Sequence, residues 1–584
     1  MRPSTIVASA VAIAAAVALA CSPTPAAAAA AKTGLGATVH STASKAEAGA
    51  PIPVALSAIA PSGRRLSSER VLAIASALAK MRSARAGYPG SYGGVYLKMP
   101  FHWQVSFFSR DGKKEIGQVI IDDLSGRVLE QWSGFQVAWT MARGYPGAFG
   151  RHVNSLYVWL PLCALFILPF FNFRRPLSLL NLDLLVLLSF SVSLAFFNHG
   201  RIYASVPLAY PPLLYLLARM LAQLRRTRAA PPPLRLLVPP AWLAIGVVFL
   251  LGFRIGLNVT DANVIDVGYA GVIGAQRIVA GKPLYRGYPS NNEHGDTYGP
   301  FNYEAYVPFQ QIFGWSGSWD DLPAAHAAAI AFDLLALVLL FLIGRRVRGP
   351  TLGVALAYAW VSYPFTLFAL ESNSNDTLVA ALVLAALLAA SYSSRIALSA
   401  RGALAALAAL TKFAPLAIAP LLATHGLRGL EPRRRAIALA TFAAFFIGAG
   451  ALAFLPALSH GTLHEFYTRT IAYQANRGSP FSVWGLYGGL GNVELAVEIG
   501  AVALALALAL LPGRGELRTL AAACAAVLIA AQLGIEHWFY LYIPWFFPLV
   551  MLALLGRFRE PATPAGAEAS SPALSSRPAA AVSS

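Results

Sequence analysis

The chain has 584 residues, of which 57% are hydrophobic and only 12% are charged. Soluble domains carry about 25% charged residues, so this composition excludes an ordinary soluble protein and indicates a membrane protein. The formal net charge of +19 does not indicate nucleic-acid binding, because the basic residues form short links such as 225–228, 345–348 and 433–435, as the positive-inside rule places them. Two of the three cysteines lie in apolar runs, which implies no disulfide framework.

The N-terminal segment predicts an exported chain. Residues 1–21 have a basic residue, Arg2, directly after Met1 and continue as an apolar run with small residues at its end, which is typical of a secretory signal. Cys21 is a candidate for lipidation, although Ala18 is a poor start for a lipoprotein signal. Residues 22–66 are rich in Ala, Ser, Thr and Pro and predict a flexible linker.

A small extracytoplasmic α+β domain is predicted over residues 67–145. Its pattern indicates a helix that starts at Ser67, followed by strand-like runs separated by Gly-containing turns. The run 119–129 resembles the closing hairpin of a PepSY-type domain, and this resemblance implies a binding or regulatory module. Asp122 and Asp123 are interpreted as turn formers rather than catalytic groups.

Twelve apolar runs between residues 156 and 555 are candidates to cross a hydrocarbon core about 30 Å thick. They are 156–171, 178–197, 203–222, 236–256, 323–343, 351–370, 376–391, 400–423, 436–456, 493–511, 518–534 and 538–555. The first three form an additional group over 156–222, and the main membrane domain covers 236–555. The tail 557–584, rich in Ala, Ser and Pro, is expected to be disordered and cytoplasmic.

The run 400–423 has Lys412 and Pro415 near its centre. A lysine in mid-membrane costs about 2.5–3.5 kcal/mol on insertion scales, and a proline removes a backbone donor. A single crossing would also put the basic link 428–435 outside. We therefore favour two half-helices that enter the membrane and return, with Lys412 at the apex beside a polar cavity. The alternative is a single crossing.

With this topology, four polar segments lie on the outer side: 258–322, 371–376, 457–491 and 536–538. Their motifs are Asp266-Val-Gly-Tyr269, Gly281-Lys-Pro-Leu-Tyr285, Tyr298-Gly-Pro300, Asn375-Asp376, Lys412-Phe-Ala-Pro415, Arg477-Gly-Ser-Pro-Phe-Ser-Val-Trp484 and His537-Trp-Phe-Tyr-Leu. In this order along the chain, they resemble glycosyltransferase family 87. The resemblance covers about residues 236–555 and leaves out the first three spans and the PepSY-like domain.

This resemblance implies a multi-span α-helical membrane protein with the C-type glycosyltransferase fold. The implied activity moves a sugar, mannose in that family, from a polyprenyl-phosphate donor to a glycolipid or cell-envelope acceptor. Its active site would face the extracytoplasmic side of the plasma membrane. Two alternatives stay open: a multi-span transporter, although no internal repeat is visible, and a membrane-anchored sensor or assembly protein acting through the PepSY-like domain.

Sugar transfer to a hydroxyl needs a base for the hydroxyl proton and cations for the departing phosphate. The resemblance places the base at Asp266, with Asp261 as the second candidate. The alternative interpretation is that Asp266 only caps a helix over 267–280, since Asp is a favoured cap.

The other site candidates are expected to bind the donor phosphate or the sugar. They are Lys412, Arg469, Arg477, Asn375, Asp376, Tyr269, Tyr298 and His537. Guanidinium groups bind phosphate through two parallel hydrogen bonds, but Arg469 and Arg477 could equally contact lipid headgroups. Asn375 and Asp376 could simply cap a helix, and His537 could belong to an interfacial aromatic belt.

No resident metal or organic cofactor is predicted. The run Glu293-His294-Gly-Asp296 offers oxygen and imidazole ligands. It has no recognised ligand spacing, so a polar loop tip is the preferred interpretation and a divalent cation stays open.

Overall fold

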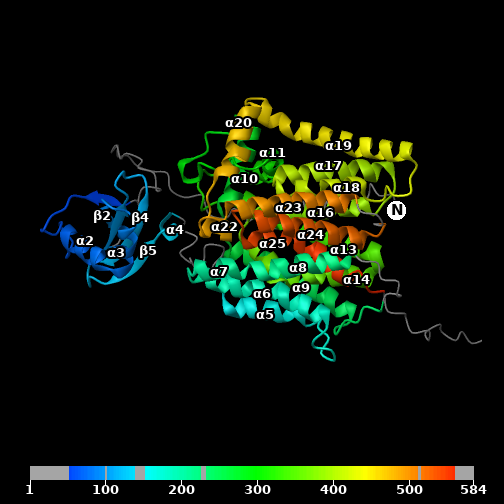
Figure 1. Cartoon of the computed structure of the whole chain (residues 1–584), viewed down its shortest axis with the longest axis horizontal. Helices are drawn as coiled ribbons and strands as arrows, with labels where there is room; N and C mark the ends of the chain where they lie inside the picture. Colours follow the sequence, from blue (N-terminus) through cyan, green and yellow to red (C-terminus); the bar gives the residue numbers. More distant parts are fainter. Residues whose placement is uncertain (1–50, 99–100, 139–151, 225–231, 511–514, 560–584) are drawn as a thin grey trace, which may run out of the picture.

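The computed structural model describes residues 51–98, 101–138, 152–224, 232–510 and 515–559. The expected signal peptide, most of the linker and all but the first three residues of the expected cytoplasmic tail lie outside these ranges. Figure 1 shows two parts: a small domain with a sheet, and a long bundle of helices that the small domain adjoins at one end.

The small domain is an antiparallel meander with the order β1-β2-β3-β4-β5 and helices α2 and α3 packed against it. Its strands are β1 (Ile52–Val54), β2 (Tyr92–Lys98), β3 (His102–Phe108), β4 (Glu115–Asp122) and β5 (Val128–Ser133), and its helices are α2 (Ser68–Ala77), α3 (Ala79–Ala86) and α4 (Phe135–Ala138). Val71 of α2, Met81 of α3 and Trp103 of β3 are fully buried between these layers. The apolar spacing of the sequence therefore gives this domain its own core.

The two aspartates of the Asp122-Asp123 turn have different roles. Asp122 accepts hydrogen bonds from the backbone and hydroxyl groups of Ser125 and is a turn former, as expected. Asp123 is buried and accepts hydrogen bonds from Trp103 Nε1 at 2.7 Å and from the backbone N–H of Arg65 at 2.9 Å. Asp123 therefore also ties the segment before α2 to the core of the sheet domain.

The bundle contains the following helices. They are α5 (Leu156–Ile167), α6 (Leu179–Asn198), α7 (Ile202–Leu208), α8 (Tyr210–Gln223), α9 (Pro240–Asp261), α10 (Asp266–Val279), η2 (Ser290–Asn292), α11 (Pro300–Glu304), α12 (Val307–Phe313), α13 (Pro323–Arg348), α14 (Pro350–Ser362), α15 (Pro364–Glu371), α16 (Asp376–Ala390), α17 (Arg395–Thr411), η3 (Ala414–Ile418), α18 (Ala419–Thr424), α19 (Pro432–Leu458), α20 (Leu463–Tyr467), η4 (Thr468–Ala472), α21 (Tyr473–Asn476), α22 (Val483–Leu486), α23 (Gly491–Leu510), α24 (Leu517–Gly534), η5 (Tyr540–Tyr542) and α25 (Ile543–Leu555).

Among the described residues, seven helices are long and apolar enough to cross a membrane, and a bent pair gives an eighth. The pair is α14 and α15, bent by 58°. The other four predicted spans form shorter or broken helices over 156–167, 376–390, 395–424 and 540–555. The protein is thus a multi-pass membrane protein in which several apolar segments are too short to cross alone.

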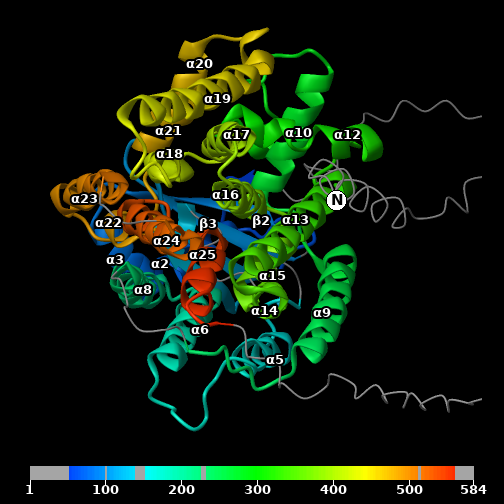
Figure 2. The same cartoon turned by 90° about the vertical axis from the view of Figure 1, so that its right-hand side faces the viewer.

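The most buried helices lie at the centre of the bundle. Figure 2 looks along the bundle and shows α16, α24 and α25 in the middle, with α9, α19 and α23 at the periphery. In α24, 78% of the 18-residue apolar stretch is buried inside the protein, whereas in α19 only 11% of the corresponding stretch is buried. Peripheral helices that are apolar on all sides are suited to contact lipid.

The segment that contains Lys412 reverses direction. Helix α17 ends at Thr411, Lys412 is extended, and the chain returns through η3 and α18. Nη1 of Arg401, in the first half of α17, donates a hydrogen bond to the carbonyl of His425 at 3.2 Å. The two ends of the segment therefore lie close together, as the half-helix interpretation requires.

This reversal predicts the sidedness of three exposed positions. Cysteines introduced at Arg395 and Arg428 should react with a membrane-impermeant thiol reagent from the same side of the membrane, and a cysteine at Gly478 should react from the opposite side. Labelling of right-side-out and inverted vesicles measures this, in a background in which the native cysteines are replaced by serine. Reaction of the first two positions from opposite sides would mean that the segment crosses once.

Candidate active site

The polar link between α15 and α16 fixes the start of α10. All six of its residues, 371–376, are fully buried. Asn373 adopts a left-handed backbone with φ of 51° and accepts a hydrogen bond from Asn258 Nδ2 at 3.0 Å. The carbonyl of Ser372 accepts from the backbone N–H of Ile265 at 3.1 Å. A Cβ atom on Gly268 would lie 2.2 Å from the Asn373 carbonyl oxygen, so α10 can pack here only with glycine.

Lys412 forms a buried ion pair with Asp376. Its Nζ lies 2.6 Å from Oδ1 of Asp376, and Trp545 Nε1 donates to the same oxygen at 2.9 Å. The side chain of Asp376 is 0% exposed and that of Lys412 is 10% exposed. The ammonium also lies 4.9 Å from the ring centroid of Tyr542 and 5.9 Å from that of Tyr298. Asp376 thus holds Lys412 in a small aromatic enclosure.

Asp266 is the first residue of α10, and its side chain is accessible to solvent. Burial nevertheless raises the pKa of this carboxyl group, and the positive charges of Arg477 and Lys412 offset part of that rise. The N-cap residue of α10 is Ile265, which forms no side-chain cap.

Two more residues of the outer loops lie within electrostatic range of this cluster. Burial lowers the pKa of His537 well below its usual value, and the charges of Arg477 and Lys412 lower it further. Its Nδ1 is 2.8 Å from Oγ of Ser479. Burial likewise raises the pKa of Tyr298, with contributions from the nearby Asp266 and Asp376 carboxylates.

These groups form what we call the cation cluster, which consists of Asp266, Tyr298, Asp376, Lys412, Arg477 and His537. They come from five separate stretches of the chain and meet at one end of the bundle. The arrangement combines two basic side chains, a carboxylate that solvent can reach and a neutral imidazole. Such a set can neutralise a phosphate and accept a proton.

The structure gives the other predicted site residues local partners. Asp261 pairs with Nδ1 of His152 at 2.7 Å. Asn375 Nδ2 donates to Oδ1 of Asn302 at 2.6 Å. The buried ring of Tyr269 stacks on Trp319 with a centroid distance of 4.7 Å.

Arg469 binds the loop 293–296, which contains the candidate metal ligands. Its Nε lies 2.7 Å from Oδ2 of Asp296, and its Nη2 donates to the carbonyl of Glu293. The ring of His294 stacks on Tyr473 with a centroid distance of 4.5 Å. Asp296 therefore faces a protein cation. Among the residues that the structure describes, no group of three His, Cys, Asp or Glu could hold a metal.

Two aromatic residues that lie beside the cation cluster were not predicted. Tyr542 and Trp545 stack on each other beside Lys412, with a centroid distance of 4.3 Å. Both lie in the apolar run 538–555, where an aromatic residue is most simply interpreted as lipid-facing or core. Their contact with Lys412 is visible only in the structure, because the spacing of residues in the sequence does not indicate it.

The fold and the cluster define a multi-pass membrane protein with a polar, cation-rich site at one end. The family model described as "Glycosyltransferase family 87" matches residues 297–566. The matched region therefore belongs to this family, and the protein is a membrane glycosyltransferase. The match confirms the resemblance and includes Tyr298, Asp376, Lys412, Arg477 and His537. Asp266 lies before it. No curated protein and no solved structure matches the chain.

The buried ion pair between Lys412 and Asp376 should stabilise the folded protein. Breaking a buried pair by removing one partner typically costs 3–5 kcal/mol, because it leaves an uncompensated charge, so Asp376→Asn should destabilise by about that amount. The double variant Asp376→Asn/Lys412→Met should recover much of the loss. The more exposed pair Arg286–Glu465 gives a control, since Glu465→Gln should cost at most about 1 kcal/mol. Thermal unfolding in detergent measures all three. Equal losses of stability in Asp376→Asn and Glu465→Gln would contradict the conclusion that the buried pair contributes more than the exposed one.

Proposed function

We propose that this glycosyltransferase moves a sugar from a polyprenyl-phosphate donor to the hydroxyl of a glycolipid or cell-envelope acceptor. The observation that carries the proposal is that the Asp266 carboxylate lies within electrostatic range of Arg477 and Lys412. A base and two cations within electrostatic range of one another match what transfer from a lipid phosphate requires. The family resemblance supports mannose as the sugar.

In the proposed reaction, the acceptor oxygen attacks the anomeric carbon of the sugar while the bond from that carbon to the phosphate oxygen breaks. Asp266 takes the proton of the acceptor hydroxyl. The polyprenyl phosphate leaves with the electron pair of the broken bond, and Arg477 and Lys412 neutralise its charge. Burial supports Asp266 as the base, because a raised pKa increases the proton affinity of a carboxylate.

Asp376 is proposed as a positioning residue. Its Oδ1 accepts from both Lys412 and Trp545, so it fixes the direction of the ammonium and has no exposure through which it could reach a sugar. His537 is proposed to act as a neutral hydrogen-bonding group near the phosphate.

The orientation is part of the proposal. The cation cluster lies at the end of the bundle that adjoins the sheet domain, where Gln136 Nε2 donates to the carbonyl of Gly200 at 2.7 Å. Arg346 and Arg518 lie at the opposite end. Since basic residues favour the cytoplasmic side, the site and the PepSY-like domain are proposed to face the extracytoplasmic side of the plasma membrane.

The central test is Asp266→Asn. Asparagine keeps the shape of the side chain but cannot accept the proton, and general-base catalysis contributes about 10²- to 10⁴-fold. Turnover of a polyprenyl-phosphate mannose donor should fall by that factor while donor binding is kept. Asp261→Asn is the matched control, because Asp261 pairs with His152 away from the cluster, and it should retain near-normal turnover. Near-normal turnover in Asp266→Asn would remove this residue from the mechanism.

The pH dependence gives a second test. The base acts when deprotonated, so turnover should be present above the pKa of Asp266 and lost as the pH falls through it. Arg477 lowers that pKa, so Arg477→Gln should raise it and move the acidic limb of the pH–kcat profile to higher pH. The profile is measured at saturating donor, to separate this shift from weaker binding. An unchanged acidic limb would show that another group titrates.

A further inference from the structure

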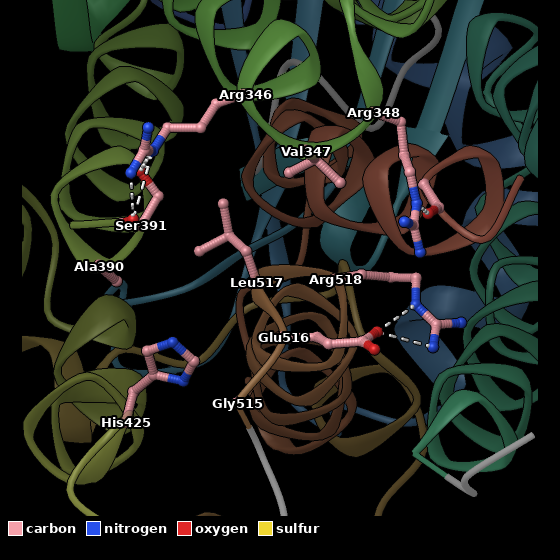
Figure 3. A pocket seen from close by; sticks show the side chains of 11 residues that line it. Arg346, Val347, Arg348, Ala390, Ser391, His425, Gly515, Glu516, Leu517 and Arg518 are labelled. Atoms are coloured by element: carbon pink, nitrogen blue, oxygen red, sulfur yellow. Dashed lines mark hydrogen bonds and ion pairs between the residues drawn. The ribbon is translucent and has the colours of Figure 1, made fainter. Parts of the chain in front are cut away.

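A cavity of about 420 Å³ lies at the other end of the bundle. It is formed by the last turns of α13 and α16, the start of α24 and the residue that follows α25. Figure 3 shows the side chains of Arg346, Arg348 and Arg518 around this space, with Val347 and Leu517 between them. These arginines give the cavity a basic rim, beside two apolar side chains.

The charge of this rim is not balanced by the described residues that line it. Glu516 is the one acid among them, and it pairs with Arg518 at 3.1 Å. Arg346 donates to Ser391, and Nε of Arg348 donates to the carbonyl of Gly556 at 3.2 Å. These acceptors are neutral, so two positive charges remain. Each guanidinium has five N–H donors, and the recorded bonds use only some of them.

The cavity is remote from the cation cluster. Helix α16 begins at Asp376, which binds Lys412, and ends at Ala390, which lines the cavity. Fifteen helical residues at a rise of 1.5 Å each span about 22 Å. One ligand headgroup cannot occupy both places. The cavity is therefore a separate feature that the proposed sugar transfer does not use.

We propose that this cavity binds a phosphate-bearing anion, namely the headgroup of an anionic phospholipid in the adjacent leaflet. Guanidinium groups bind phosphate oxygens in bidentate geometry, and basic pockets between transmembrane helices on the cytoplasmic side are suited to phosphate headgroups. Solvated arginines that only follow the positive-inside rule would not need to surround a hollow. Here three of them do, beside apolar residues that can contact the glycerol and acyl carbons.

The test is lipid binding to the full chain in detergent, followed by native mass spectrometry. The wild type should bind phosphatidylglycerol more tightly than phosphatidylcholine. The variant Arg346→Gln/Arg348→Gln removes the two unbalanced charges and should bind phosphatidylglycerol more weakly by about tenfold per arginine, because each substitution loses charge-assisted hydrogen bonds. Arg346→Lys/Arg348→Lys keeps the charge but loses the bidentate geometry, so its affinity for phosphatidylglycerol should lie between those of the wild type and the glutamine variant.

Matched controls separate a site from general attraction. Arg433 and Arg434 are exposed at the start of α19 and do not line the cavity, so Arg433→Gln/Arg434→Gln should leave binding unchanged. Leu517→Trp fills the cavity without changing its charge and should weaken binding, which keeps the test valid if the arginine variants unfold. Inorganic phosphate is added alone as a second probe.

Each outcome decides the proposal. The lipid site is supported if the wild type prefers phosphatidylglycerol to phosphatidylcholine and only the cavity variants lose phosphatidylglycerol binding. Tight binding of inorganic phosphate that needs the same arginines supports the anion site but assigns it to a soluble phosphate. Equal losses in the cavity and control variants, or equal binding of the two lipids, would overturn it. These measurements do not depend on transferase activity, so they remain valid if the proposed function fails.

Discussion

The buried ion pair between Lys412 and Asp376 is the interaction on which the active end of the bundle depends. An ammonium group removed from water is costly unless a counter-charge meets it, and neither residue can satisfy its charge within its own segment. Lys412 stands where α17 stops, and Asp376 stands where α16 starts. Pairing them therefore brings two breaks in the helical backbone together and creates a polar place inside an apolar bundle.

The consequences of this pairing extend to the outer loops. A Cβ on Gly299 would lie 2.1 Å from the carbonyl oxygen of Leu410, two residues before Lys412, so the Gly299-Pro300 turn packs directly against the end of α17. The link 371–376, which leads into Asp376, fixes the start of α10 through Ser372 and Asn373. Asp266 thus reaches the cations through two rigid backbone contacts rather than through a flexible loop.

Some of this arrangement could be predicted from the sequence. An intramembrane lysine next to a proline predicts a chain reversal and a functional charge, and the segment does reverse at Lys412. The number of full-length spans was not predictable in the same way, because hydropathy measures apolar length and does not show that α14 and α15 meet at a 58° bend.

The pairing of charges was the least predictable feature. Arg254 of α9 and Asp333 of α13 form a fully buried pair at 2.6 Å, with Trp360 also donating to Asp333. They are far apart in the chain, and nothing in the local pattern of either helix points to the other. The same limit applied to Asp376, which the sequence presented as a helix cap or sugar contact.

The partners of the acids also distinguish structural from reactive carboxylates. In the outer segments, Asp261 and Asp296 each lie 2.7 Å from a basic side chain, so each already has a partner within the protein. Within the described part of the chain, Asp266 has no basic side chain within ion-pair distance. Its nearest cations act through space and only partly offset burial. An acid in that position retains proton affinity while a phosphate occupies the cations, which is the division of roles that the proposed transfer needs.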